Sequence, residues 1–191
     1  MKKQITGIIF LLLLSLSIPA QTADRSVEKI RKIYTDVAEK ARLAENDDEQ
    51  GQFGELVMSE LVINKRSRQW RAVGIYGQTF RFFYKGGNSE AHLYPDELVL
   101  VKAERRVSNR KYAEEYLFDG SGRLIFYFQR SENDDQGPAE RRIYFDAARA
   151  VRVTEDGKSR DKLTAADLAT AREATAAAAR IRDVFARSIK L

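Results

Sequence analysis

The stretch EYLFDGSGRLIFYFQR, residues 115–130, has the pattern of two apolar strands joined by a tight turn. The segment Asp119-Gly120-Ser121-Gly122 has the composition of a β-turn, and Gly122 suits the left-handed position of a three-residue hairpin loop. The stretch therefore predicts an antiparallel hairpin. Its aromatic side chains, present at nearly every inward position, have two interpretations: a ligand-binding surface or the core of a sheet.

Pairing outward from this turn gives the expected register of the hairpin. The aligned pairs are Phe118 with Leu124, Leu117 with Ile125 and Tyr116 with Phe126. Because side chains alternate along a strand, the hairpin has one core face and a second face that is apolar enough to be partly covered. The core face is expected to carry Tyr116, Phe118, Leu124, Phe126 and Phe128. The second face is expected to carry Leu117, Ile125 and Tyr127.

The hairpin belongs to a succession of strand-like segments separated by short polar or glycine-containing links. Short links favour antiparallel neighbours over helical crossovers, so the segments predict a meander. The expected strands are residues 56–63, 70–76, 79–85, 98–106, 111–119, 123–129, 142–146 and 150–154. They give a sheet of about seven or eight strands within residues 55–155, and barrel-like closure is the alternative because twisted sheets of this size tend to curl.

A helix is expected before the sheet, at residues 24–45, and another after it, at residues 164–190. Both segments place apolar side chains at helical spacing, and Thr164 with Asp167 forms a capping box at the second start. The first stripe is Val27, Ile30, Tyr34, Val37, Ala41 and Ala44. The second stripe is Leu168, Ala171, Ala174, Ala178, Ile181, Phe185 and Ile189. The predicted fold is α+β, a single twisted antiparallel sheet with both helices covering one concave face.

The first 20 residues have the composition of a secretory signal peptide. Lys2 and Lys3 precede an apolar run that ends at Ile18, and Ala20 is a small residue suited to cleavage. The run is shorter than the roughly 20 residues of a membrane span, and an uncleaved anchor is the alternative. We expect residues 21–191 to form one periplasmic or secreted domain, whose net charge falls from +5 to about +3 when the two lysines are removed.

Patterns for catalysis or metal binding are sparse. The chain has no cysteine, which excludes disulfides, zinc-thiolate sites and cysteine nucleophiles. His92 is the only histidine, and no GxSxG sequence accompanies it. The acidic segment 131–138 lacks the spacing of an EF-hand loop. Glu114 and Glu115 are adjacent and so face opposite sides of a strand, which argues against a catalytic pair. No catalytic residue, metal site or cofactor is therefore predicted.

Two sets of residues are candidate binding sites. The aromatic set predicts a pocket between helix and sheet, with the filled core as the alternative. It consists of Trp70, Tyr76, Phe82, Tyr116, Phe126 and Phe128. The basic set flanks one hairpin turn and predicts a rim that attracts phosphate, carboxylate or sulfate groups. The alternative is a charged edge that prevents the sheet from pairing with other chains. It consists of Arg105, Arg106, Arg110 and Lys111.

These features favour an exported, non-catalytic binding or interaction module whose partner is a small molecule or an envelope protein of unknown identity. A small exported hydrolase that uses His92 or acidic residues is one alternative. A protein-binding inhibitor or assembly factor that engages through a strand edge or the C-terminal helix is another. Nucleic acid is not an expected partner because the net charge is low, and no membrane span is expected in the mature chain.

Overall fold

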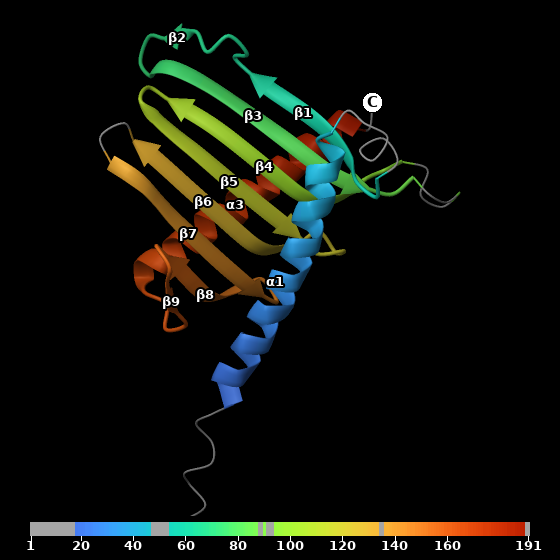
Figure 1. Ribbon diagram of the computed structural model, residues 1–191, viewed down its shortest axis with the longest axis vertical. Helices are drawn as coiled ribbons and strands as arrows, with labels where there is room; N and C mark the ends of the chain where they lie inside the picture. The colour runs from blue at the N-terminus through green and yellow to red at the C-terminus, as the bar shows by residue number, and fades with distance from the viewer. Residues whose placement is uncertain (1–17, 47–53, 88–89, 91–93, 134–135, 190–191) are drawn as a thin grey trace, which may run out of the picture.

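The computed structural model describes residues 18–46, 54–87, 90, 94–133 and 136–189. Within them, an antiparallel sheet of nine strands lies between two long helices (Figure 1). The helices are α1 (Ile18–Ala44) and α3 (Ala165–Ile189). The strands are β1 (Val57–Ile63), β2 (Gln69–Trp70), β3 (Gly74–Lys85), β4 (Glu97–Val107), β5 (Arg110–Phe118), β6 (Leu124–Asn133), β7 (Gln136–Asp146), β8 (Arg149–Glu155) and β9 (Lys158–Arg160).

The sheet follows the order of the chain, apart from the short β2, which pairs with the beginning of β3. Its path ends at β1 and β9, so the sheet is open and not a barrel. The predicted antiparallel meander between two helices is thus confirmed. The strand expected at residues 70–76 is divided, because Trp70 belongs to β2, residues 71–73 form a turn and residues 74–76 begin β3. β3 then continues through the strand expected at residues 79–85, because Gly77 remains extended and pairs with Arg106.

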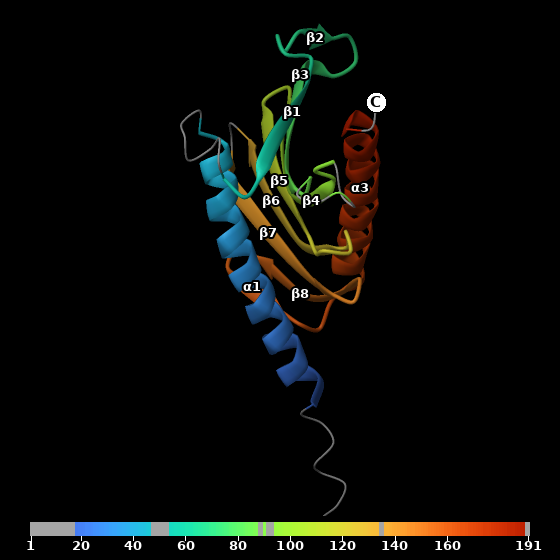
Figure 2. The ribbon, with the colours of Figure 1, turned by 90° about the vertical axis from the view of Figure 1, so that its right-hand side faces the viewer.

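The two helices cover opposite faces of the sheet (Figure 2). Phe83 and Leu117 pack in the core beneath α1, whereas Phe82 and Tyr116 pack in the core beneath α3. Consecutive residues of a strand point to opposite faces, so each of these strands supplies both cores. The expectation that both helices share one concave face is therefore wrong, and the molecule has three layers.

A bulge in β6 changes the register of the hairpin that begins at Phe118. The observed pairs are Phe118 with Leu124, Leu117 with Phe126 and Tyr116 with Tyr127. The extra residue, Ile125, moves Tyr127 to the α3 face and leaves Phe126 and Phe128 on the α1 face. The prediction that Phe126 and Phe128 share a face with Tyr116 is therefore wrong.

The helical stripes are present at most of the expected positions. The buried residues of the α1 stripe are Val27, Ile30, Val37 and Ala41. Those of the α3 stripe are Ala171, Ala174, Ala178 and Phe185. Leu168 was expected in the buried stripe but is 42% exposed. The neighbouring Asp167 points inward in its place, because it caps the helix together with Thr164. Neither described helix has a segment both long and apolar enough to cross a bilayer.

The β7–β8 connection is a two-residue turn formed by Ala147 and Ala148, with φ angles of 46° and 68°. Both alanines lie in the left-handed region, which costs an L-residue about 1–2 kcal/mol. Asp156 and Gly157 form a two-residue turn of the same type between β8 and β9, with φ angles of 46° and 82°. Asp-Gly and Asn-Gly are the sequences that such turns favour. The Ala-Ala turn is therefore strained where its neighbour is not.

Replacing Ala147 by Asn and Ala148 by Gly is expected to raise the free energy of unfolding by about 1–2 kcal/mol, because both residues tolerate positive φ. Urea denaturation measures the change. Gly157→Ala is the matched control in the neighbouring turn and should shift the midpoint in the opposite direction. An unchanged midpoint in the Asn-Gly variant would show that the two alanines store no strain.

Candidate anion-binding cleft

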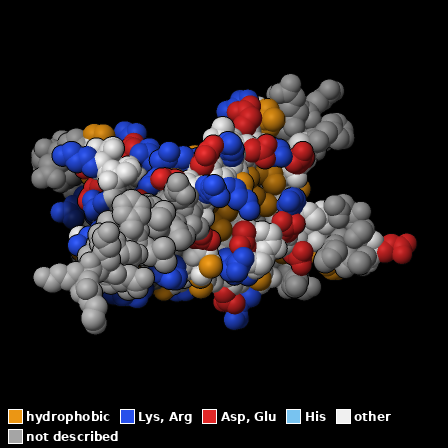
Figure 3. Space-filling view, turned by 90° about the horizontal axis from the view of Figure 1, so that it is seen from below, with side chains coloured by type: hydrophobic (Ala, Val, Ile, Leu, Met, Phe, Trp, Pro, Cys, Tyr) orange, Lys and Arg blue, Asp and Glu red, His pale blue; other side chains and the backbone are white. Residues whose placement is uncertain are grey.

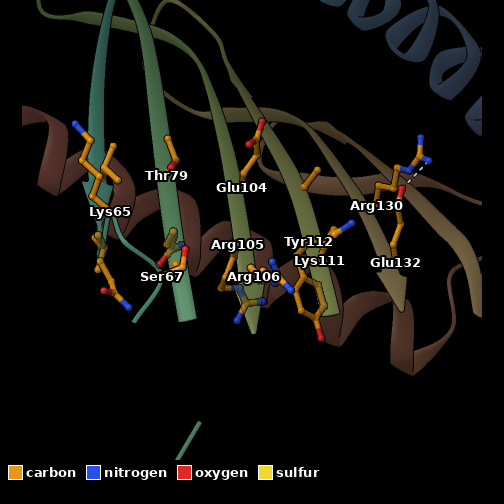
Figure 4. A pocket seen from close by; sticks show the side chains of 16 residues that line it. Lys65, Ser67, Thr79, Glu104, Arg105, Arg106, Lys111, Tyr112, Arg130 and Glu132 are labelled. Atoms are coloured by element: carbon orange, nitrogen blue, oxygen red, sulfur yellow. Dashed lines mark ion pairs between the residues drawn. The ribbon is translucent and has the colours of Figure 1, made fainter. Parts of the chain in front are cut away.

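A cleft of about 420 Å³ lies at the end of the sheet where β4 turns into β5 (Figure 4). Its walls come from β1, β3, β4, β5 and β6 and from the loop that follows β1. Ala113 lies among the lining residues, and its small side chain leaves space between the longer side chains around it. The cleft is therefore a hollow in the sheet surface that side-chain size creates.

The loop after β1 forms a fixed wall of this cleft. The Asn64 side chain donates hydrogen bonds to the backbone oxygens of Arg68 (2.8 Å) and Tyr76 (2.6 Å), which ties the loop to β3. The Ser67 amide donates to the Asn64 oxygen at 2.7 Å. A Cβ atom on Gly77 would lie only 2.9 Å from the Ser67 hydroxyl oxygen. Glycine at position 77 thus lets this loop approach the strand closely.

The cleft has more basic than acidic lining residues. The basic residues are Lys65, Arg105, Arg106, Lys111 and Arg130, and the acidic ones are Glu104 and Glu132. Both carboxylates already have a cationic partner. Glu104 pairs with Arg81 at 3.0 Å, and Glu132 pairs with Arg130 at 2.7 Å. The remaining basic residues therefore give this end of the sheet a positive charge that the lining carboxylates do not balance.

Arg106 and Lys111 are directly opposite each other on β4 and β5. Both are exposed, and neither forms an ion pair within the described residues; the same is true of Lys65. The Arg106 Nε atom donates to the Ser108 backbone oxygen at 3.2 Å, which fixes the guanidinium at the turn. Like charges directly opposite on neighbouring strands destabilise a sheet. Glu132 lies opposite Lys111 on β6 but pairs with Arg130, so a bound anion would reduce this repulsion further.

The structure brings three of the four predicted rim residues into the lining of the cleft: Arg105, Arg106 and Lys111. Arg105 belongs to the strand face under α3, and its guanidinium lies 4.5 Å from the centre of the Tyr112 ring. Arg110 pairs with Val107 across the turn and does not line the cleft. The four residues share one end of the sheet and lie on both of its faces.

Two of the predicted aromatic residues lie on the α1 face, away from the others. Phe126 is buried, with its ring centre 4.8 Å from Tyr34 and 5.1 Å from Tyr144. Phe128 packs against the same core, and the Arg142 guanidinium lies 5.2 Å from its ring centre. Both residues therefore contribute to the core beneath α1.

A second cavity, of about 370 Å³, lies between α3 and the sheet and is lined by Tyr76, Phe82 and Tyr116. Phe82 and Tyr116 are also members of the core beneath α3. Trp70 does not line this cavity, but its ring stacks on Tyr76 with centres 4.4 Å apart. The six aromatic residues thus do not form one pocket.

Glu114 accepts hydrogen bonds from the hydroxyls of Tyr127 (2.9 Å) and Tyr116 (3.2 Å). Burial and the adjacent carboxylate raise the pKa of both tyrosines above its usual range, so they remain neutral donors. Glu115 accepts from Tyr34 at 2.7 Å on the other face. Glu114 and Glu115 therefore face opposite sides, as expected: Glu114 bonds to tyrosines of the sheet, and Glu115 bonds to a tyrosine of α1.

His92, Asp134 and Asp135 lie outside the described residues. Among the described residues, no group of three or more His, Asp or Glu side chains is placed to hold a metal ion. Sequence reasoning missed Lys65 as a lining residue, although the basic run at residues 65–68 is visible in the sequence. Comparison of the chain with family models, curated proteins and solved structures found no match.

Proposed function

We propose that the protein is an exported, non-catalytic binding module whose cleft binds an anionic ligand. The observation that carries the proposal is the opposed pair Arg106 and Lys111, with Lys65 in the same lining and no ion pair to any of them in the described residues. A carboxylate, phosphate or sulfate group would supply the missing negative charge. Export is supported by the composition of residues 1–20.

The cleft is a better candidate than the cavity under α3. Phe82 and Tyr116 line that cavity and are nearly fully buried, so their main contribution is to the core. The cleft instead presents hydroxyl groups, including those of Ser67 and Thr79, beside its unpaired cations. Hydroxyl and cationic donors together suit an oxyanion.

Binding fits the cleft better than catalysis does. Its two carboxylates, Glu104 and Glu132, are engaged by arginines, so neither is a free general base. None of the residues that line the cleft is a histidine. A nucleophile needs an adjacent base within hydrogen-bond reach, and the lining provides no such pair.

Citrate and inorganic pyrophosphate are suitable probes because each presents several negative charges in a volume that the cleft accommodates. We expect both to bind, with an affinity that falls as salt concentration rises. Arg106→Gln and Lys111→Gln should each weaken binding about tenfold or more, since a hydrogen bond to a charged group contributes roughly 1.5–3 kcal/mol. Isothermal titration calorimetry at low ionic strength measures both effects.

Arg110→Gln is the matched control, because it removes the same charge from the same turn without touching the lining of the cleft. Its affinity for either probe should stay within about twofold of the parent, as screening predicts for an exposed charge outside the site. If Arg110→Gln weakens binding as much as Lys111→Gln, the interaction is with the general positive charge of this end, and the cleft is not the site.

A further inference from the structure

The segment KRSRQWRAVGI, residues 65–75, contains β2 and projects beyond the end of the sheet (Figures 1 and 2). We call this segment the β2 tip. It contains Lys65, Arg66, Arg68 and Arg71, and no acidic residue occurs between positions 61 and 80. These four basic residues are exposed and form no ion pair within the described residues. The β2 tip is therefore strongly cationic.

The β2 tip also exposes large apolar side chains. Trp70 is 45% exposed, and Val73 and Ile75 are each 39% exposed. A water-soluble surface rarely gathers large apolar residues without a functional reason. Their position among arginines produces an amphipathic surface at one end of the protein.

The conformation of the β2 tip is defined by hydrogen bonds at its base. The Asn64 side chain joins the first part of the segment to β3 by its hydrogen bonds to the backbone oxygens of Arg68 and Tyr76. The Val73 amide donates to the Trp70 oxygen at 3.1 Å, and the Ser108 amide donates to the Ile75 oxygen at 2.7 Å. Stacking on Tyr76 holds one face of the Trp70 ring. The exposed residues are thus presented by an ordered structure and need little reorganisation to bind.

The opposite end of the molecule has a different character. Figure 3 views that end and shows basic and acidic side chains interspersed on the visible surface. Arg152 is paired there with Asp24 at 2.7 Å, and Arg160 with Glu155 at 3.0 Å. Unbalanced positive charge together with exposed apolar residues is therefore a property of the β2 tip.

We infer that the β2 tip docks onto an anionic phospholipid surface. The arginines would contact lipid phosphates, while Trp70, Val73 and Ile75 would enter the boundary between headgroups and acyl chains. Tryptophan is enriched at this boundary because its ring is amphipathic. Charge complementarity selects anionic lipids, and the apolar residues favour a bilayer over nucleic acid, which would leave Val73 and Ile75 without a partner. This inference goes beyond the anion-binding cleft and does not depend on it.

Trp70 is the only tryptophan of the chain, so its fluorescence reports on the β2 tip even if another segment also touches the lipid. The full chain is mixed with vesicles of phosphatidylcholine, with and without phosphatidylglycerol. We expect a blue shift of Trp70 emission with the mixed vesicles and none with phosphatidylcholine alone. The variant Arg66→Glu/Arg68→Glu/Arg71→Glu should lose about a hundredfold in affinity, because each basic residue near an anionic surface contributes several-fold.

The variant Arg25→Glu/Lys29→Glu/Lys32→Glu is the matched control, since it makes the same charge change on exposed positions of α1. It should retain the shift, and so should Lys111→Gln, which tests the cleft separately. Val73→Asp should abolish the shift while leaving the circular dichroism spectrum unchanged. Sedimentation with vesicles without any change in Trp70 emission would overturn the inference. So would a shift produced by a single-stranded oligonucleotide and not by vesicles.

Discussion

Replacement of Phe126 by alanine is expected to lower the free energy of unfolding by about 3–5 kcal/mol, the usual range for an aromatic residue removed from a core. Phe126 is 3% exposed and contacts Tyr34 of α1 and Tyr144 of β7, so it connects the helix to the sheet. The cavity left behind would lie between these layers. Urea denaturation followed by circular dichroism measures the change.

Trp70→Ala is the matched control, because Trp70 was expected from the sequence to share a pocket with Phe126. Its side chain is 45% exposed and stacks on Tyr76. The loss of stability should therefore be limited to about 1 kcal/mol, the contribution of one aromatic pair. If Phe126→Ala were as mild as Trp70→Ala, Phe126 would be lining an accessible pocket, and its assignment to the core would be wrong.

Asp167→Asn is expected to lower the free energy of unfolding by about 2–4 kcal/mol, since it removes the charge of a buried carboxylate that pairs with the half-buried Arg160 at a helix cap. Asp167 is 2% exposed. Its carboxylate accepts hydrogen bonds from Arg160 (2.8 Å) and from the amide and hydroxyl of Thr164 (2.9 and 2.8 Å). An amide at this position would oppose the Arg160 donors with a donor of its own.

The effect of Asp167→Asn should depend on pH. The Arg160 guanidinium holds the pKa of the Asp167 carboxyl well below its usual range. A group whose pKa is lowered by folding contributes stability that is fully present above its unfolded pKa and is lost as pH falls through the folded pKa. The difference in unfolding free energy between parent and variant should therefore be largest at neutral pH. It should shrink below about pH 4, where the unfolded carboxyl begins to take up a proton.

Asp183→Asn serves as the control on the same helix. Asp183 pairs with Arg187 in an ion pair whose side chains are 60% and 80% exposed. Exposed pairs contribute about 0.5 kcal/mol, so this variant should be nearly as stable as the parent at every pH. A constant difference between Asp167→Asn and the parent from neutral to acidic pH would show that the carboxyl charge is not what stabilises the cap.

The antiparallel order of the strands could be predicted from the sequence because most connections are short and carry turn residues. The distribution of the helices over two faces was missed, although adjacent apolar residues such as Phe82 and Phe83 indicate a strand covered on both sides. The bulge at Ile125 left no comparable signal, since one unpaired residue does not alter the composition of a strand. A single bulge was nevertheless enough to exchange the faces of Phe126 and Tyr127.

The candidate site was only partly predictable for a related reason. Arg106 and Lys111 flank one turn, so their proximity follows from local sequence. Lys65 reaches the same cleft through the pairing of β1 with β3, which brings together residues that local patterns do not connect. The close approach of the loop after β1 to Gly77 was also missed, because a glycine between two apolar segments favours a turn when only the sequence is considered.

The contacts of α1 affect the order in which parts of the protein can fold. Ser26 donates to Asp146, 120 residues later, and Arg152 donates to Asp24 across 128 residues. During synthesis the N-terminal end of α1 therefore gains these two polar contacts only after β7 and β8 have been made. Contacts of such high sequence separation slow folding. The attachment of this end of α1 to the sheet is therefore among the last steps that the growing chain can complete.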